Sequence, residues 1–218
     1  MLARRNIGGL KTYSHAGQDL FALLLLKRKH SGTYVEIGAQ DPIKNSNSFL
    51  LENDYGWSGI SFELRNDFYT FFSYRRGNPC IRADATALNY LEIFKSAKLP
   101  QQIDFLQVDI EPASATLAAL RQLPHDHYRF SVITFEHDCY QAGPEVRQES
   151  RRFLTGKGYR IFAKDVRFQG VAFEDWWIDP KVFPCFVSAP EPIYADTEYD
   201  EIIQTLPKTL STYSFETA

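Results

Sequence analysis

The sequence predicts one α/β domain, a doubly wound, Rossmann-like sheet that helices cover on both faces. Its 218 residues suit a single domain of this class. Short β-rich segments alternate with helical segments of about ten residues, the pattern of parallel strands joined by helices. The last two expected strands stand too close together for a crossover helix and should pair antiparallel. We therefore expect a seven-stranded sheet, mostly parallel, with a C-terminal antiparallel hairpin.

Each element follows from local signals. A helix is expected over Asp19–Lys29, stopped by Ser31 and Gly32, and a buried strand over Thr33–Ile37, ended by Gly38. The later strands are expected at Gly59–Glu63, Cys80–Ala83, Ile103–Val108, Phe130–Phe135, Tyr159–Ala163 and Val171–Ile178. The later helices are expected at Ser46–Asn53, Asp67–Tyr74, Ala87–Ala97, Ala113–Gln122 and Glu145–Thr155, and a short polar helix at Glu198–Thr205 follows a proline-rich stretch.

Charge and composition argue against several classes of protein. The net charge is −3 and no basic stripe stands out, so we expect no nucleic-acid partner. The longest apolar run, Leu20–Leu26, is too short to span a bilayer. Cys80, Cys139 and Cys185 lack Cys-x-x-Cys spacing, which favours reduced thiols. We find no secretory signal, and we expect a cytoplasmic protein.

An acidic residue closes each of the first five expected strands. In open α/β sheets the ligand lies beyond the carboxyl ends of the strands, so these residues should line one site. Acidic residues scattered at random among the turns would not coincide with the end of every one of these strands. The acidic strand ends are Glu36–Asp41, Glu63, Asp84, Asp109–Glu111 and Glu136–Asp138.

The turn after the first strand indicates the kind of ligand. A dinucleotide site uses Gly-x-Gly-x-x-Gly, which lets the backbone approach a pyrophosphate. The turn Glu36-Ile-Gly-Ala-Gln-Asp41 has one glycine and two carboxylates and runs into Pro42. Carboxylates repel a pyrophosphate and suit a cationic ligand without phosphate. S-adenosylmethionine, which carries a sulfonium and an ammonium group, fits this description.

Four segments resemble FkbM-type methyltransferases, class I enzymes that methylate hydroxyl groups, often on sugars or secondary metabolites. The segments are Ser-His-Ala-Gly-Gln-Asp (14–19), Val-Glu-Ile-Gly-Ala-Gln-Asp-Pro (35–42), Ser-Asn-Ser-Phe-Leu-Leu-Glu (46–52) and Gly-Trp-Ser-Gly-Ile (56–60). The resemblance runs from about Ser14 to about Ile178. The family's acidic-Gly-x-x-x-Gly turn is altered, because Pro42-Ile43 stands where a second glycine could fall.

The resemblance implies roles at the cofactor site. It implies that the backbone of Gly38 and Ala39 faces the methionine end of S-adenosylmethionine, with Glu36 below. Asp109 would sit near the amino group or the transferring methyl. Further candidate contacts to the cofactor or substrate are Gln18, Asp41 and Asn47.

The other end of the cofactor would meet the second and third strands. The resemblance implies that Glu63 accepts hydrogen bonds from both ribose hydroxyls, which matches a bidentate carboxylate. Asp84 and Ala85 would contact the adenine. An alternative for Asp84 is that it caps the following helix.

The segments Asp109–Glu111 and Glu136–Asp138 should bring four carboxylates and an imidazole together. Clustered carboxylates are costly unless something positive binds. The candidates are the sulfonium, a hard divalent cation such as Mg²⁺, or plain solvation at the sheet edge. The expected ligands of such a metal are Asp109, Glu111 and Asp138.

A methyl transfer to a hydroxyl group requires a base that removes one proton. His137 is a candidate base, and its alternative role is to orient Asp138. Asp138 or Glu111 could act instead, with Asp109 beside the reacting groups. Positioning of the nucleophile, methyl and sulfur in line supplies most of the rate.

Several other residues favour ordinary interpretations. Cys139 lacks a third orienting group and is more typical of packing, and His15 is more typical of a surface loop. Strand alternation places one ring of Trp176–Trp177 in the core and one on the surface. His125–His127 lies in a loop away from the expected site.

The sequence thus predicts an S-adenosylmethionine-dependent O-methyltransferase acting on a hydroxyl of a sugar, a glycan or a small hydroxylated metabolite. The alternatives are a dinucleotide-dependent oxidoreductase and a non-catalytic module that binds S-adenosylmethionine. We expect an N-terminal helical segment, 1–32, that covers the cofactor site, a methyltransferase domain, 33–180, and a surface-packed or mobile tail, 181–218.

Overall fold

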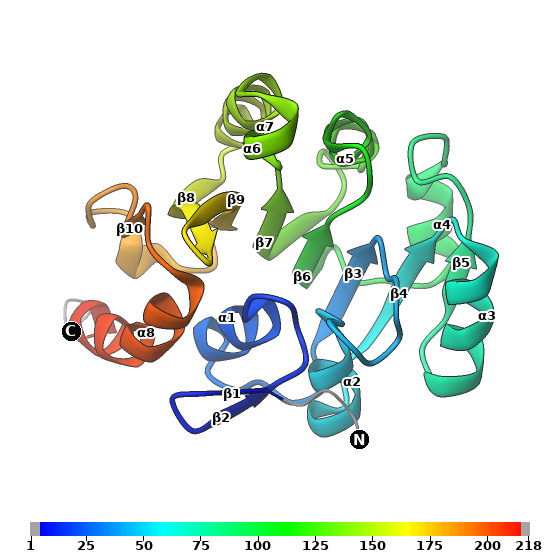
Figure 1. The fold of residues 1–218 in the computed structure, drawn as a ribbon, viewed down its shortest axis with the longest axis horizontal. Helices are drawn as coiled ribbons and strands as arrows, with labels where there is room; N and C mark the ends of the chain where they lie inside the picture. The colour runs from blue at the N-terminus through cyan, green and yellow to red at the C-terminus, as the bar shows by residue number, and fades with distance from the viewer. Residues whose placement is uncertain (1–4, 215–218) are drawn as a thin grey trace.

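Eight strands form one central sheet in the order β10-β8-β9-β7-β6-β3-β4-β5 (Figure 1). The structure is a computed structural model that describes residues 5–214. Residues 1–4 and 215–218, the outer ends of the expected N- and C-terminal segments, lie outside this described part. The strands are β3 (Thr33–Ile37), β4 (Ser58–Glu63), β5 (Cys80–Arg82), β6 (Gln102–Val108), β7 (Arg129–Glu136), β8 (Arg160–Phe168), β9 (Val171–Ile178) and β10 (Tyr194–Ala195).

The five strands β3 to β7 are parallel to one another, and β9 runs antiparallel to both β7 and β8. The expected parallel sheet with an antiparallel hairpin is therefore confirmed. The expected number of seven strands is wrong, because β10 adds a short parallel pairing to β8. A strand of two residues between Pro192 and Asp196 is too short to produce a periodic pattern in the sequence.

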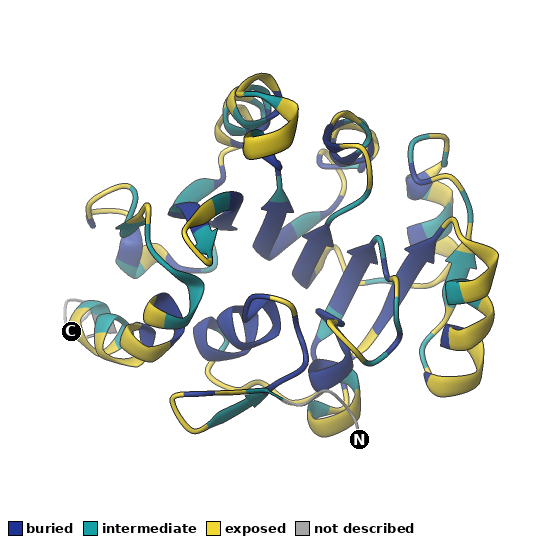
Figure 2. Ribbon diagram, in the orientation of Figure 1, coloured by how far each residue is buried: buried dark blue, intermediate teal, exposed yellow. Residues whose placement is uncertain are grey.

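Helices cover both faces of the sheet, and each face has its own apolar core. In Figure 1, α1, α2 and α8 lie on one side of the sheet and α5 and α7 on the other. The central strands are buried along their length (Figure 2). The helices are α1 (Gln18–Leu25), α2 (Phe49–Tyr55), α3 (Asn66–Arg75), α4 (Tyr90–Ser96), α5 (Ala113–Gln122), α6 (Cys139–Ala142), α7 (Glu145–Gly156) and α8 (Tyr199–Ser214), with a 3₁₀ turn, η1, at Pro184–Phe186.

The two adjacent tryptophans of β9 point to opposite faces of the sheet, as strand alternation requires. Trp176 belongs to the core under α1, and Trp177 belongs to the core under α5 and α7. Both are fully buried. The expectation that one ring lies on the surface is wrong, because β9 is an interior strand between β8 and β7 with helices over both faces.

A two-stranded hairpin precedes α1, formed by β1 (Arg5–Ile7) and β2 (Leu10–Thr12). Its turn is Gly8-Gly9, and both glycines have positive φ, as a tight hairpin turn requires. Asp19 fixes the hairpin to the first turn of α1: its carboxylate accepts from Thr12 Oγ1 at 2.5 Å and from Ser14 Oγ at 2.7 Å. The expected helical N-terminal segment thus contains a hairpin as well as a helix.

The segment after Pro180 contributes buried side chains to the core beneath α1. Phe183, Phe186 and Ile202 are among them. Helix α8 is longer than the expected Glu198–Thr205, because Leu206, Leu210 and Tyr213 continue the apolar face of Ile202 and Ile203 against the core beneath α1. No helix within residues 5–214 is long and apolar enough to cross a membrane.

Candidate functional site

Four carboxyl side chains form a row along the edge of the sheet where the parallel strands end. The strand register aligns them: Glu36 lies beside Gln107, two residues before Asp109, and Glu136 pairs directly with Glu174 of β9. The row therefore crosses β3, β6, β7 and β9. Glu174 was missed from the sequence, although two acids inside the apolar run of β9 were a usable signal.

The turn after β3 places its backbone tightly against the next strand. Gly38 has φ +93°, and a Cβ atom at this position would lie 1.7 Å from the carbonyl oxygen of Asp109. Only glycine fits such an approach. The N–H groups of Gly38 and Ala39 both donate to the carbonyl of Phe62, at 3.0 and 3.1 Å, so they are engaged within the sheet.

Glu36 lies below this turn and is fully buried. One of its oxygens, Oε2, accepts from the hydroxyls of Ser48 (2.8 Å) and Ser61 (2.7 Å). The other, Oε1, is buried and has no hydrogen-bond partner among residues 5–214. Burial raises the pKa of Glu36, against the opposing effect of the nearby Arg76 guanidinium.

Arg76 follows α3 and holds the loop between β3 and α2. Its guanidinium is buried and donates to Glu52 Oε2 (2.8 Å), Ser48 Oγ (2.9 Å) and the carbonyl of Pro42 (2.9 Å). Sequence reasoning missed it, since an Arg-Arg pair at the end of a helix is typical of an exposed surface. The guanidinium fixes the loop that carries Asn47, whose side-chain oxygen is buried and unpartnered.

Glu63, at the end of β4, is held by the backbone on both carboxylate oxygens. The N–H of Gln40 donates to Oε2 (2.8 Å) and the N–H of Arg65 donates to Oε1 (2.7 Å). Each oxygen retains a further lone pair. The next residue, Leu64, is 63% exposed, an apolar side chain beside the expected ribose site that the sequence analysis did not single out.

Asp84 lies at the end of β5, exposed, and accepts from the N–H (2.8 Å) and hydroxyl (2.7 Å) of Thr86. It therefore stabilises a turn; the residue that caps α4 is Asn89, which accepts from the N–H of Glu92. The expectation that Asp84 caps this helix is wrong, because α4 begins later than predicted. Ala85 beside it is buried.

Asp109 and Glu136 are neighbours at this edge, because the residues before them, Val108 and Phe135, pair in the two strands. Burial, together with the charges of Asp138 and Glu111, raises the pKa of Asp109 to about 6. Burial and the neighbouring Asp109 also raise the pKa of Glu136 well above its ordinary value.

Glu174 completes the row at β9. The side-chain amide of Gln18, at the start of α1, donates to its Oε2 (2.7 Å), and the Trp176 indole donates to its Oε1 (2.9 Å). Burial raises the pKa of Glu174 well above its ordinary value. The side-chain amide of Gln18 is thus already hydrogen-bonded to a carboxyl group. Asp41, another expected cofactor contact, accepts from the N–H groups of Ile43 and Lys44 in its own turn.

Asp138 and Glu111 are close neighbours at the same edge. Asp138 is buried, and its Oδ1 has no hydrogen-bond partner in the described part of the chain. Burial, followed by the charge of Asp138, raises the pKa of Glu111, which is exposed at the rim. The four carboxylates expected from the sequence therefore do converge.

The imidazole of His137 does not join them. The side chain is fully buried and faces away from the carboxyl row. Its Nε2 lies 3.8 Å from Asp165 Oδ1 and 3.7 Å from Asp175 Oδ1. Guanidiniums from α7 bind the same carboxylates: Arg151 contacts both aspartates and Arg147 contacts Asp165. His137 points the opposite way from its neighbours because successive residues at a strand end alternate in direction.

Within residues 5–214, one group of three side chains brings possible metal-ligand atoms within 4.8 Å of one another: His137, Cys139 and Asp165. The expected set of Asp109, Glu111 and Asp138 does not form such a group.

The remaining histidines and Cys139 are placed in ordinary surroundings. His125 is buried among aromatic rings at the opposite edge, bonded to the carbonyl of Leu120, and burial lowers its pKa to about 4. The Cys139 thiol contacts the carbonyl of Ala172 at 3.6 Å, and burial raises its pKa. His15 is exposed, and its ring lies 4.4 Å from that of Phe168.

Solved structures share this fold. An inferred O-methyltransferase from Klebsiella pneumoniae is 12% identical to this chain and has a TM-score of 0.55; the match covers 79% of this chain and 84% of the Klebsiella chain. An inferred rRNA methylase from Clostridium thermocellum is 13% identical to this chain and has a TM-score of 0.52; the match covers 78% of this chain and 97% of the Clostridium chain. A TehB-like S-adenosylmethionine-dependent methyltransferase from Corynebacterium glutamicum is 12% identical over 74% of this chain and 87% of its own, with a TM-score of 0.47.

No protein-family model and no curated protein matches the chain in sequence. The chain therefore has the Rossmann-like fold of methyltransferases, and the resemblance to FkbM-type enzymes stays a prediction. Because one of these structures is an inferred rRNA methylase, the comparison does not support the expectation that nucleic acid is excluded as a partner.

Proposed function

We propose that this protein is an S-adenosylmethionine-dependent O-methyltransferase whose acceptor is a hydroxyl of a sugar, a glycan or a small hydroxylated metabolite. The observation that carries the proposal is the row of carboxyl groups beside a turn with a single glycine, Gly38. A cationic ligand offsets the mutual repulsion of these groups, whereas a pyrophosphate would increase it. The shared methyltransferase fold agrees with this choice.

The residues present fit S-adenosylmethionine. Two buried oxygens, Glu36 Oε1 and Asn47 Oδ1, lack hydrogen-bond partners within residues 5–214 and could accept from an ammonium group or an ordered water. The backbone-held carboxylate of Glu63 would bind the ribose hydroxyls through its remaining lone pairs. Exposed Leu64 and the turn at Asp84 and Ala85 would flank the adenine.

S-adenosylmethionine supplies an electrophilic methyl group when bound. The protein's own residues hold the acceptor hydroxyl in line and remove its proton as the new bond forms. Asp138 and Glu111 are the best candidates for this proton transfer, because Asp138 is buried at this edge and Glu111 lies beside it at the exposed rim. His137 is enclosed by Asp165 and Asp175, and we assign it a positioning role in the segment that carries Asp138.

Calorimetric titration with S-adenosylhomocysteine and with NAD tests the cofactor class. We expect S-adenosylhomocysteine alone to bind, and binding of NAD alone would eliminate the proposal in favour of an oxidoreductase. A labelled-methyl transfer screen against nucleotide sugars and oligosaccharides tests the reaction. Bound cofactor without transfer to any acceptor would favour the non-catalytic module.

Variants of the proposed base separate binding from chemistry. Asp138→Asn should lower kcat about 10²-fold or more, the usual contribution of a general base, while S-adenosylhomocysteine binds as before. Asp126→Asn is the matched control, an exposed aspartate at the opposite edge that should leave kcat unchanged. Equal activity of Asp138→Asn and Asp126→Asn would remove Asp138 as the base.

A further inference from the structure

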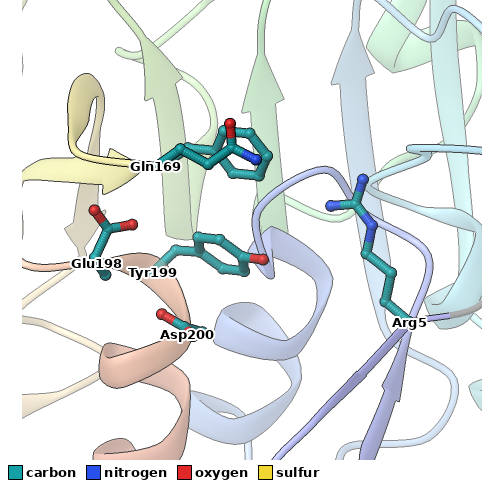
Figure 3. Close-up of a pocket in the computed structure, with 6 residues that line it drawn as sticks. Arg5, Gln169, Glu198, Tyr199 and Asp200 are labelled. Atoms are coloured by element: carbon teal, nitrogen blue, oxygen red, sulfur yellow. The ribbon is translucent and has the colours of Figure 1, made fainter.

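A pocket of about 330 Å³ opens where the N-terminal hairpin, the β8–β9 turn and the start of α8 meet (Figure 3). This volume is at the lower end of the range of small-molecule sites, roughly 300–1,000 Å³, and suits a ligand of a single ring. The lining residues are Arg5, Phe168, Gln169, Glu198, Tyr199 and Asp200.

The pocket adjoins the carboxyl row through a short chain of contacts. Gln18 donates to Glu174 at 2.7 Å. Gly17 precedes Gln18, and a Cβ atom at Gly17 would lie 3.4 Å from the ring of Tyr199. The turn beyond Phe168 leads into β9, which begins at Val171, three residues before Glu174. A ligand in the pocket is thus a neighbour of the edge where the methyl group would be transferred.

The walls of the pocket combine flat apolar surface with hydrogen-bond acceptors. The rings of Phe168 and Tyr199 stack, with centroids 5.6 Å apart and planes inclined by 23°. The imidazole of His15 also lies against Phe168, with ring centroids 4.4 Å apart. The carboxylates of Glu198 and Asp200 and the amide of Gln169 lie around it (Figure 3).

The charges in the pocket favour an uncharged ligand. Arg5 supplies one positive charge against the two carboxylates, so the lining is negative overall and repels an anionic ring. Carboxylates and amides accept hydrogen bonds from hydroxyl groups, and aromatic faces pack against the apolar C–H face of a ring. A neutral ring with several hydroxyl groups satisfies both surfaces at once.

We propose that this pocket is the acceptor-binding site and that it takes an uncharged pyranose ring, presenting one hydroxyl toward the carboxyl row. This inference rests on the proposed methyl transfer. It assigns acceptor recognition to segments at the two ends of the chain, the hairpin and α8, which pack against each other where Gly8 meets Gln204.

The test uses ligand-detected NMR on the protein saturated with S-adenosylhomocysteine. The probes are methyl β-D-glucopyranoside, methyl α-D-mannopyranoside, methyl α-L-rhamnopyranoside and sodium D-glucuronate. We expect at least one neutral glycoside to bind more tightly than glucuronate. Asp200→Asn should weaken that binding about tenfold, the loss expected for one hydrogen bond to a charged group.

Matched variants keep the outcome interpretable. Gln169→Ala changes an exposed turn and should also weaken glycoside binding, whereas Glu201→Gln, an exposed acid next to Asp200 that does not line the pocket, should not. Equal binding in Asp200→Asn, Gln169→Ala and Glu201→Gln would overturn the proposal, as would binding of glucuronate alone or of no probe. A separate calorimetric titration with S-adenosylhomocysteine tests the methyltransferase proposal, so the two failures are distinguishable.

Discussion

The close approach of Gly38 to the next strand makes Gly38→Ala the most informative substitution. The added Cβ would lie 1.7 Å from the carbonyl oxygen of Asp109, at a residue whose φ is +93°. A left-handed backbone costs a non-glycine residue about 1–2 kcal/mol. Moving closely packed neighbours to relieve the overlap adds about 1–3 kcal/mol. We expect the free energy of unfolding to fall by about 2–5 kcal/mol.

Gly56→Ala is the matched control. Gly56 also has a positive φ, +66°, but apart from its two chain neighbours no atom of the described residues lies within 4 Å of the position of its Cβ. Only the backbone strain of about 1–2 kcal/mol applies there. For a chain of this size each kcal/mol lowers Tm by roughly 2–4 °C, so we expect a fall of about 10 °C for Gly38→Ala and about 4 °C for Gly56→Ala.

Calorimetric unfolding of both variants measures these shifts, and titration with S-adenosylhomocysteine measures the effect on the site. Since the turn at Gly38 borders the proposed cofactor site, Gly38→Ala should weaken binding and Gly56→Ala should not. Equal Tm shifts would refute the tight approach of the turn to β6. A folded Gly38→Ala variant with unchanged affinity would refute the placement of the cofactor at this turn.

Three further predictions follow from the site. Arg76→Met should lower Tm by about 10 °C, because removing one partner of a buried ion pair costs about 3–5 kcal/mol. Arg65→Met is the control: Arg65 is an exposed arginine paired with Asp67, and its loss should leave Tm unchanged. Equal shifts of Tm in the two variants would contradict the role of Arg76. The pKa of Asp109 is raised from 3.8 to about 6, so the folded state binds its proton more tightly than the unfolded state, and the free energy of unfolding should fall as pH rises through this window. Urea unfolding at a series of pH values should show that this free energy falls less steeply with pH in Asp109→Asn. An unchanged dependence on pH would exclude Asp109 as its source. Methyl transfer should persist in EDTA, because the expected metal ligands do not form a group of three; loss of activity that Mg²⁺ restores would reverse this conclusion.

The strand pattern and the acidic strand ends were accessible from the sequence because they depend on short stretches of chain. The helix Ala113–Gln122 and the strand Thr33–Ile37 have their predicted bounds. Gly38 was identified from its place after a β-rich run, and its positive φ agrees with that placement. Parallel strands end at one edge of a sheet, so the convergence of Asp109 and Asp138 also followed from the pattern alone.

Other features depend on contacts between distant segments. The burial of Arg76 is created by acceptors on a loop about thirty residues earlier, which no local pattern encodes. The direction of His137 could have been inferred from strand alternation, but its partners Asp165 and Asp175 come from a hairpin whose register carries irregularities. Strand β10 has two residues, too few for a periodic signal.

The sequence by itself determined the class of fold and the acidic edge of the sheet, because alternation and strand ends are local properties that the chain repeats element after element. Only the tertiary structure decided which of those acids are buried side by side, that the imidazole of His137 is enclosed by Asp165 and Asp175, and that Gln18 bonds to Glu174 in the row. The physical reason is that pKa and hydrogen-bond partners depend on burial and on neighbours far away in sequence. The pocket between the hairpin and α8 is likewise formed only when the two ends of the chain meet.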